Sequence, residues 1–322
     1  MTVDLVPAEI TRAVAILRAG GLVAFPTETV YGLGADASNA EAVTKVFAAK
    51  GRPHDHPLIV HIASAAQLAD WAREIPPAAQ TLAKTFWPGP LTLILKRANH
   101  VSDLVTGGQD SVALRVPAHP VAQALLQEFG GGMVGPSANR FGHVSATTAE
   151  HVRQEFGNTV ECVLDGGACA VGIESTIVDL SGEKPAVLRP GGITAAQIES
   201  ALGVPLAAAG AQSPRAPGTL EKHYAPETPV MLVEAEVIDE RARSFVRQGQ
   251  RVAVLARTAR QPLVDKVVWL AAMVTSAAYA HDLYANLRKL DAAGCDVLLV
   301  EEPPLSADWA AVRDRLTRAA KR

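Results

Sequence analysis

Short apolar runs alternate with amphipathic stretches along most of the chain, and this alternation limits the folds that it can adopt. The apolar runs have the length of strands and lie at 22–25, 58–62, 91–95, 112–116, 176–180 and 186–188. In the first amphipathic stretch, Ile10, Ala13, Val14 and Leu17 share a helical face, and Pro7 lies near its start. Strands interleaved with helices predict an α/β layer structure.

Residue types at the ends of the amphipathic stretches support this interpretation. Asn39 is suited to cap a helix whose Val43, Val46 and Phe47 face inward, and Gly51 supplies a stop. Further helices are expected at 120–129 and 148–156.

The alternation breaks at residues 206–229, which combine small residues with four prolines and show no amphipathic period. We therefore expect a first domain at 1–205, a linker at 206–229 that also acts as a lid, and a smaller Rossmann-like α/β domain at 230–322. The second domain is predicted from strands at 230–233, 252–255 and 297–301 and helices at 276–292 and 309–319. It has no glycine loop of the phosphate-binding kind, so no ligand is assigned to it.

Charge and cysteine content narrow the class of protein. The 30 basic and 33 acidic side chains give a formal charge of −3, which disfavours stable binding of nucleic acid as the main task. Cys162, Cys169 and Cys295 are odd in number and form no CxxC pair, as expected for reduced thiols in the cytosol. The N-terminus does not resemble a signal peptide and no run is apolar enough to span a bilayer, so we expect a soluble cytoplasmic protein without membrane partners.

Several motifs of nucleotide-binding and hydrolytic enzymes are absent or fail in context. There is no P-loop, and Gly130, Gly132 and Gly135 match GxGxxG but follow a predicted helix and run into a proline. The serine of GPSAN at 135–139 lacks the last glycine of a nucleophile elbow. His54, His56 and His61 cluster without nearby carboxylates or cysteines at ligand spacing, so we predict no protein metal site.

Polar residues instead lie at the ends of apolar runs, where open α/β sheets bind ligands. The segment FPTETVYGLG at 25–34 has the composition of a turn that follows a buried strand. Lys50 and Arg52 stand at a helix end and in a proline-containing loop. They fit either a complement to the helix dipole or a grip on phosphate.

Arg115 lies in an apolar strand and therefore needs a partner, either an internal carboxylate or the carboxylate of a substrate. The loop 135–148 is dense in hydroxyl and amide groups, which suits a phosphate cradle as well as plain turns. Ser175 and Arg189 are further polar residues at strand edges.

Taken together, these segments resemble the threonylcarbamoyl-AMP synthase family, the YrdC-type fold in its long form with an added C-terminal domain. The resemblance rests on nine segments that occur in the family's order: PTETVYGL, KGRP with PLIVHI, WPGPLTLIL, VALRVPAHP, GPSAN, the serine of GHVSATT, GIESTIVD, VLRPGG and the HYAP of the linker. The family's fold implies a twisted, open mixed sheet with flanking helices in the first domain.

The resemblance also implies a reaction. L-threonine, bicarbonate and ATP would give threonylcarbamoyl-AMP and pyrophosphate, which makes the protein a nucleotidyltransferase. Partner proteins would then transfer the threonylcarbamoyl group to the adenosine beside the anticodon of tRNA.

Motif positions carry the family's contacts to this chain. The implied threonine-binding residues are Thr27, His61, Arg115, Gly135 (through its backbone) and Ser175. The implied ATP-binding residues are Lys50, Arg52, Ser111, Ser137, Asn139, Ser145, Arg189 and Tyr224. Lys50 and Arg52 are taken as catalytic cations, and Tyr224 would fold the linker over the nucleotide as part of a lid.

The types of residue in these motifs suit that reaction. A carbamate is already an anion, so its attack on phosphorus needs alignment and charge neutralisation rather than a side-chain base. Mg²⁺ on the leaving pyrophosphate would complete the neutralisation, without a protein ligand that the sequence identifies. Two alternatives are an RNA-binding module of the same fold and a carbamoyl-adenylate domain of the hydrogenase-maturation type. An aromatic content of 5% offers few stacking platforms for RNA.

Overall fold

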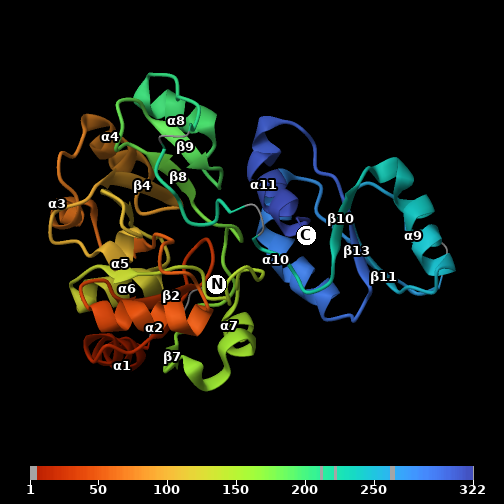
Figure 1. The fold of residues 1–322 in the computed structure, drawn as a ribbon, viewed down its shortest axis with the longest axis horizontal. Helices are drawn as coiled ribbons and strands as arrows, with labels where there is room; N and C mark the ends of the chain where they lie inside the picture. The colour runs from red at the N-terminus through yellow and green to blue at the C-terminus, as the bar shows by residue number, and fades with distance from the viewer. Residues whose placement is uncertain (1–5, 211–212, 221–222, 262–264, 322) are drawn as a thin grey trace. The chain divides into compact units, whose positions relative to one another are not determined.

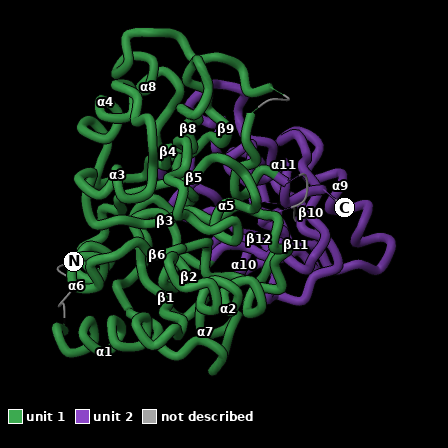
Figure 2. Tube along the Cα trace, turned by 60° about the vertical axis from the view of Figure 1, so that its left-hand side comes forward, with its two compact units in different colours: residues 1–141, 146–219 green, residues 142–145, 220–322 purple. Residues whose placement is uncertain are grey.

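The computed structural model describes residues 6–210, 213–220, 223–261 and 265–321. Compactness divides the chain into two units. The first unit comprises residues 1–141 and 146–219, and the second comprises residues 142–145 and 220–322 (Figure 2). The change from the first unit to the second along the chain thus falls inside the proline-rich segment 206–229.

The first unit alternates helices and strands (Figure 1). Its helices are α1 (Pro7–Arg18), α2 (Ala40–Lys50), α3 (Leu68–Trp71), α4 (Pro77–Phe86), α5 (Asp103–Thr106), α6 (Pro120–Phe129), α7 (Ala149–Phe156) and α8 (Ala195–Leu202). Its strands are β1 (Val23–Phe25), β2 (Gly32–Asp36), β3 (Ile59–His61), β4 (Leu91–Lys96), β5 (Ser111–Arg115), β6 (Met133–Val134), β7 (Cys162–Val163), β8 (Thr176–Asp179) and β9 (Ala186–Arg189).

Among the described residues, these strands form one nine-stranded sheet in the order β7-β1-β2-β6-β3-β5-β4-β8-β9. Three neighbouring pairs, β7–β1, β3–β5 and β4–β8, are parallel, and the remaining pairs are antiparallel. The prediction of a mixed sheet with flanking helices is therefore confirmed. The segment 26–31, expected as a turn after a strand, connects β1 and β2 as an antiparallel pair.

Helix ends follow the capping signals of the sequence. The Asn39 side chain accepts hydrogen bonds from the N–H groups of Glu41 and Ala42 and so caps α2. Gly51 ends the same helix with φ of 63°, a left-handed conformation that glycine adopts without steric cost. This stop places Lys50 at the last position of α2 and Arg52 directly after the Gly51 cap.

Two clusters of apolar side chains cover the sheet of the first unit. The main core includes Leu33, Val60, Leu93, Leu114 and Val178, one from each of five strands. A second cluster packs residues of α1 and α6 against Val23, Phe25 and Met133, and these two helices contact each other. The buried strand residues of the second cluster come from β1 and β6, and Cys162 of β7 packs against them, so the same face of β3, β5, β4 and β8 is left to other residues.

The second unit contains strands β10 (Val230–Val233), β11 (Val252–Ala256), β12 (Val267–Ala271) and β13 (Val297–Glu301) and helices α9 (Ile238–Arg247), α10 (Ser276–Asp291) and α11 (Ala310–Ala319). All four strands are parallel, in the order β10-β13-β11-β12. This parallel sheet confirms the predicted α/β class of the second domain. The final helix begins at Ala310, one residue after the expected Trp309, which lies in a preceding 3-10 turn.

The carboxyl end of β13 carries a buried carboxylate. Glu301 accepts hydrogen bonds from the backbone N–H groups of Arg257, Thr258 and Ala259 and from the Thr258 hydroxyl. Burial opposes ionisation of Glu301, but these hydrogen bonds together outweigh it and hold its pKa below the ordinary 4.5. The backbone N–H groups that follow β11 therefore already donate hydrogen bonds to the carboxylate of Glu301.

None of the helices in the described parts of the chain combines the length and the apolar character that crossing a membrane requires.

Candidate active site

Four neighbouring strands place alternate residues on the sheet face that lies opposite the main core. Side chains on successive residues of a strand point to opposite faces. Because Val60, Leu93, Leu114 and Val178 enter the main core, their neighbours face the other way. Four of these neighbours form an apolar floor, and Ala216 of the segment 206–229 packs on it; the floor consists of Ile59, Ile94, Ala113 and Ile177.

Polar residues with the same alternation border the apolar floor. They are His61 at the end of β3, Thr92 in β4, Ser111 and Arg115 at the two ends of β5, and Ser175 just before β8. All five are buried. Period-two alternation therefore places several sequence-predicted site residues on one face of the sheet.

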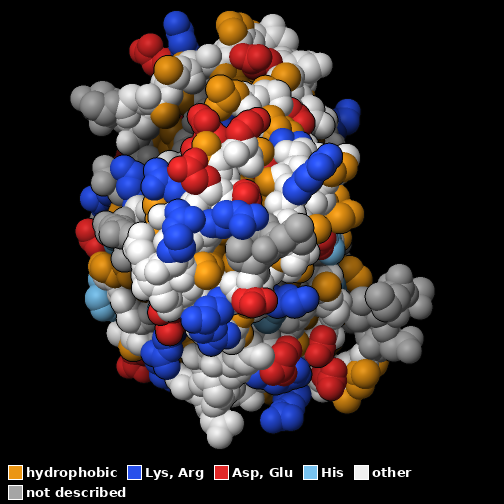
Figure 3. All heavy atoms as spheres, turned by 90° about the vertical axis from the view of Figure 1, so that its right-hand side faces the viewer, with side chains coloured by type: hydrophobic (Ala, Val, Ile, Leu, Met, Phe, Trp, Pro, Cys, Tyr) orange, Lys and Arg blue, Asp and Glu red, His pale blue; other side chains and the backbone are white. Residues whose placement is uncertain are grey.

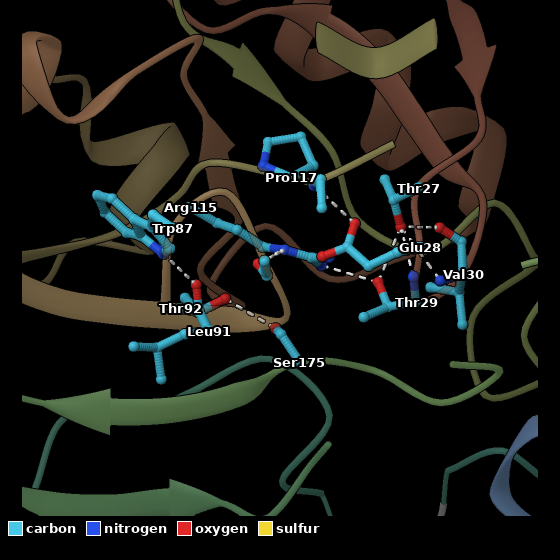
Figure 4. Close-up of polar contacts among 12 residues, drawn as sticks. Thr27, Glu28, Thr29, Val30, Trp87, Leu91, Thr92, Arg115, Pro117 and Ser175 are labelled. Atoms are coloured by element: carbon cyan, nitrogen blue, oxygen red, sulfur yellow. Dashed lines mark hydrogen bonds and ion pairs between the residues drawn. The ribbon is translucent and has the colours of Figure 1, made fainter. Parts of the chain in front are cut away.

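Arg115 has an internal carboxylate partner, which was one of the two partners that the sequence allowed. Its Nη2 atom lies 2.7 Å from Oε1 of Glu28, its Nη1 donates to the Thr29 hydroxyl at 2.8 Å, and its Nε donates to the Gly89 carbonyl at 3.2 Å. Figure 4 shows the guanidinium group of Arg115 reaching the β1–β2 turn.

The hydroxyl group of Thr27 is held within the same turn. It donates to the carbonyl of Val30 at 2.6 Å and accepts from the N–H groups of Thr29 and Val30. It also lies 2.8 Å from the Thr29 hydroxyl. A contact from Thr27 to threonine would therefore require the turn to exchange one of these hydrogen bonds, because the single hydroxyl proton is already used.

His61 is a neutral imidazole in this environment. Burial lowers its pKa to about 3, and the positive charge of Arg115 acts in the same direction. Phe25 contacts the imidazole ring edge-on with a centroid distance of 5.5 Å. A side chain at position 135 would place its Cβ 2.7 Å from Nδ1 of His61, so Gly135 is required for this packing.

Ser175 and Arg189 are held together at the β8–β9 edge of the site. The guanidinium group of Arg189 donates to the Ser175 carbonyl from Nε and Nη2 and to its hydroxyl at 3.1 Å. The Thr92 hydroxyl lies 2.7 Å from the Ser175 hydroxyl. Figure 4 labels both residues. Nη1 of Arg189 donates to the Pro217 carbonyl at 2.9 Å.

Lys50 connects the end of α2 to the GPSAN loop. Its Nζ donates to the carbonyl of Ser137 at 2.6 Å and to that of Asn139. Burial lowers the pKa of Lys50 well below 10.5, and the charge of nearby Arg52 lowers it further. The carboxylates of Glu155 and Glu174 act in the opposite direction and raise the pKa of Lys50, but burial and Arg52 outweigh them.

Arg52 and the remaining loop residues complete the set in the first unit. Arg52 donates to the Pro57 carbonyl at 3.0 Å, and its Cζ lies 5.8 Å from the centroid of the Phe141 ring. Asn139 is buried and donates from Nδ2 to the Arg140 carbonyl. Ser111 pairs with Lys96 across the β4–β5 ladder.

Ser145 and Tyr224 belong to the second unit. Ser145 is buried, and its carbonyl accepts from Nε of Arg288 at 3.3 Å. Tyr224 is buried with φ of 60°; its ring stacks on Tyr284, and Cζ of Arg315 lies 5.2 Å from its centroid. Their expected contacts with ATP remain predictions.

The motifs set aside in the sequence have structural roles. Gly130 ends α6 with φ of 79°, and the chain then enters β6 rather than a helix, so this GxGxxG does not form a dinucleotide loop. Among the residues that the structure describes, no group of three or more His, Cys, Asp or Glu side chains is placed to hold a metal ion.

Sequence reasoning missed three polar residues that contact the site. Glu28 and Thr29 hold Arg115, and Thr92 contacts Ser175. Glu28 and Thr29 fall in a segment whose composition indicates a turn, and Thr92 is one polar residue in an apolar strand. The expectation that Arg115 needs a carboxylate partner was the signal that could have led to Glu28.

Fold and site define an α/β protein whose first unit holds buried cations, hydroxyls and a neutral imidazole. Residues 15–191 match the Sua5–YciO–YrdC family model, described as Telomere recombination. Residues 193–321 match the model described as the C-terminal domain of threonylcarbamoyl-AMP synthase.

Relatives and solved structures agree with these matches. The chain is 42% identical to a threonylcarbamoyl-AMP synthase of Pyrococcus abyssi, over 97% of this chain and 94% of that protein. It is 41% identical to one of Bacillus subtilis, over 97% and 93%. The structure of P. abyssi Sua5 in complex with L-threonine matches with a TM-score of 0.92 and 40% identity, covering 98% of this chain and 95% of that one. The chain therefore belongs to the threonylcarbamoyl-AMP synthase family, in its long form.

Proposed function

We propose that this protein is an L-threonylcarbamoyladenylate synthase, a nucleotidyltransferase that uses L-threonine, bicarbonate and ATP. The observation that carries the proposal is the family match along both units, combined with a site built from buried cations and hydroxyls. Bicarbonate and the threonine amine form a carbamate with loss of water. A carbamate oxygen then bonds to the α-phosphorus, and pyrophosphate leaves.

The site of the first unit suits two anionic substrates at two ends. The end at Arg115, His61 and Ser175 would bind threonine, with Thr27 and the Gly135 backbone beside it. The second end would bind ATP and is built from Lys50, Arg52, Ser111, Ser137, Asn139 and Arg189. The lowered pKa of Lys50 supports this division, since a buried amine whose charged form is disfavoured by burial gains from a phosphate nearby.

Catalysis would rest on alignment and charge neutralisation. The attacking carbamate is already ionised, so no side chain has to remove a proton at that step. His61, with a pKa of about 3, stays neutral and can serve as a hydrogen-bonding wall for the amino acid rather than as a base. Arg52 and Lys50 would neutralise the charge that builds on the leaving pyrophosphate.

Mg²⁺ would come to the site bound to the nucleotide. The described residues offer no three-ligand cluster for a cation, and Mg²⁺ in such enzymes is often held by phosphates and water with few protein ligands. When bound, the ion would add to the neutralisation of the phosphates. The protein's own residues would align the reacting groups.

Residues 213–219, which we call the strap, would act as the lid in the first unit. Ala216 packs on the apolar floor, and the Pro217 carbonyl accepts from Arg189. At the other end, the backbone N–H of Arg215 donates to Gln109, and its guanidinium donates to the Gly107 carbonyl. The strap would have to lift for ATP to enter and close to keep water from the adenylate.

A role limited to binding RNA has less support. On the face seen in Figure 3, Lys and Arg side chains are interspersed with Asp and Glu rather than gathered into one basic patch. RNA would then be reached indirectly, through proteins that take the threonylcarbamoyl group to tRNA.

Release of pyrophosphate tests the proposal directly. We expect release from ATP that requires both L-threonine and bicarbonate and needs no RNA, with threonylcarbamoyl-AMP identified by mass spectrometry. Release that is equally fast with serine, or with carbamoyl phosphate in place of threonine and bicarbonate, would contradict it and favour a carbamoyl-adenylate enzyme.

A further inference from the structure

The buried ion pair between Glu28 and Arg115 bears on how the site recognises an amino acid. Arg115 is 3% exposed, and Glu28 is 9% exposed. A guanidinium group has five N–H donors in a fixed plane. Glu28, Thr29 and Gly89 accept one hydrogen bond each from Arg115. Within the described parts of the chain, two of its N–H groups therefore have no protein acceptor.

Both oxygens of the Glu28 carboxylate are used as acceptors. Oε1 accepts from Nη2 of Arg115 at 2.7 Å, and Oε2 accepts from the backbone N–H of Ala118 at 3.0 Å. The backbone carbonyl of Glu28 accepts from the N–H of Val171 at 2.7 Å. Glu28 thus ties the β1–β2 turn to the loop after β5 and fixes the end of the Arg115 side chain between them (Figure 4).

The hydroxyl groups beside Arg115 have a single allowed direction of donation. A carbonyl can only accept, so Thr27 donates its one proton to Val30. In the contact between Thr27 and Thr29, the Thr29 hydroxyl must then be the donor. Thr29 accepts from Nη1 of Arg115, which completes a chain from Arg115 through Thr29 and Thr27 to Val30. Such a chain strengthens each of its hydrogen bonds and restricts rotation of the guanidinium group.

We infer that Glu28 and Thr29 are positioning residues that orient Arg115 so that its two remaining N–H groups bind the carboxylate of the amino-acid substrate. The inference rests on the proposed function and deepens it. Bidentate donation from arginine to a carboxylate depends on the orientation of the guanidinium plane. Holding that plane before the substrate arrives lowers the entropy cost of binding.

A Glu28→Gln variant tests the positioning role because both carboxylate oxygens of Glu28 accept hydrogen bonds. An amide has one oxygen and one NH₂ group, so one of the two positions opposite Arg115 and Ala118 must present a donor to a donor. The side chain keeps its size, and the guanidinium group loses its fixed orientation. The measurement is the ratio of kcat/KM for L-threonine to that for L-threoninamide, which lacks the carboxylate charge, in the pyrophosphate assay.

We expect Glu28→Gln to lower this ratio by about 10- to 100-fold, the effect of losing a charge-assisted hydrogen bond. KM for ATP should stay within about twofold of the unaltered protein, since a local change of this kind is felt by its own ligand. Arg115→Ala should abolish the preference for threonine. Glu41→Gln, which changes an exposed carboxylate in α2, is the matched control and should leave the ratio unchanged.

Thr29→Val is a second variant that keeps the shape of the side chain and removes the acceptor for Nη1 of Arg115. It should lower the ratio in the same direction, also with little change in KM for ATP. Should Glu28→Gln fail to fold, this variant decides the question. A merely structural role would lower the melting temperature and all kinetic constants together and would leave the ratio as it was.

The two possible failures can be told apart. No threonine-dependent release by the unaltered protein overturns the proposed function. Normal release together with an unchanged ratio in folded Glu28→Gln or Thr29→Val overturns the positioning role alone.

Discussion

Single residues in this site differ in the partners that the protein gives to their charge. Nζ of Lys50 donates to two backbone carbonyls, whereas Arg115 is paired with a carboxylate. Lys50 therefore has more to gain from a phosphate group, and Arg115 keeps two N–H donors for a smaller anion. This difference at the level of single side chains supports the assignment of two substrate ends.

Arg52→Ala should lower kcat/KM for pyrophosphate release by about 100-fold or more, because the loss of a cation beside developing charge costs on the order of 3 kcal/mol. Arg52 is the more informative of the two cations, since Lys50→Ala also releases the GPSAN loop. The measurement is steady-state kinetics, with thermal melting to show that the fold is kept.

Lys84→Ala, which removes an exposed cation from α4, serves as the control for this change and should have unaltered kinetics. Normal kinetics in Arg52→Ala and Lys50→Ala would return both residues to the role of complementing the helix end.

Much of the site could be predicted from residue types, and the limits of that prediction have a physical origin. A buried arginine demands a partner, but the partner of Arg115 comes from 87 positions earlier in the chain, and no local pattern encodes that distance. The contact of Thr27 with the substrate stays a prediction, and the hydrogen bonds that use its hydroxyl in this structure depend on the conformation of a turn, which the sequence does not encode. Contacts that arise only in the tertiary structure could not be predicted from local sequence patterns.

At the scale of whole elements, apolar runs and capping residues predicted six of the nine strands and four of the eight helices described in the first unit. The strand β2 (Gly32–Asp36) was not predicted, because its sequence GLGAD has few of the branched and aromatic residues that favour strands. It forms through pairing with β1 and β6. Pairing partners thus override weak local preference where a buried sheet needs the strand.

The strap 213–219 gives a prediction about an element. Arg215→Ala removes the hydrogen bond to the Gly107 carbonyl and leaves the apolar contact of Ala216 in place. A loss of about 1 kcal/mol should make the strap open roughly fivefold more often. We expect faster hydrogen exchange at 213–219 and a severalfold rise in AMP formed by hydrolysis of the bound product.

Arg241→Ala, at an exposed position in α9, should change neither measurement and is the control. Unchanged exchange and unchanged product hydrolysis in Arg215→Ala would remove the strap from the role of a lid.

At the scale of the whole molecule, the two units should respond to acid in different ranges of pH. In the first unit, burial holds the pKa of His61 at about 3. The unfolded chain binds a proton near pH 6.5, so the stability from neutral His61 is complete above that pH and is lost as the pH falls toward 3. In the second unit, the pKa of Glu301 lies below 4.5, so its contribution is lost only at lower pH.

Lowering the pH from 7 to 5 should therefore remove about 2 kcal/mol of stability from the first unit through His61, while Glu301 keeps its contribution to the second. Burial lowers the pKa of His56 and His119 as well, which acts in the same direction. Hydrogen exchange with mass spectrometry, corrected for intrinsic exchange rates, measures the stability of each unit separately. His61→Gln should reduce the loss in the first unit. Equal acid sensitivity of both units, or no difference in the variant, would contradict this account.

The alternation along β3, β4, β5 and β8 has an evolutionary consequence. Each of these strands gives every second residue to the main core and turns the residues between them to the opposite face, where the proposed substrate site lies. Natural selection can therefore act on affinity and on foldability at interleaved positions of the same short segment. A lineage could acquire a new substrate by replacing odd-numbered residues of β5, such as Ala113, while the even-numbered ones preserve the architecture.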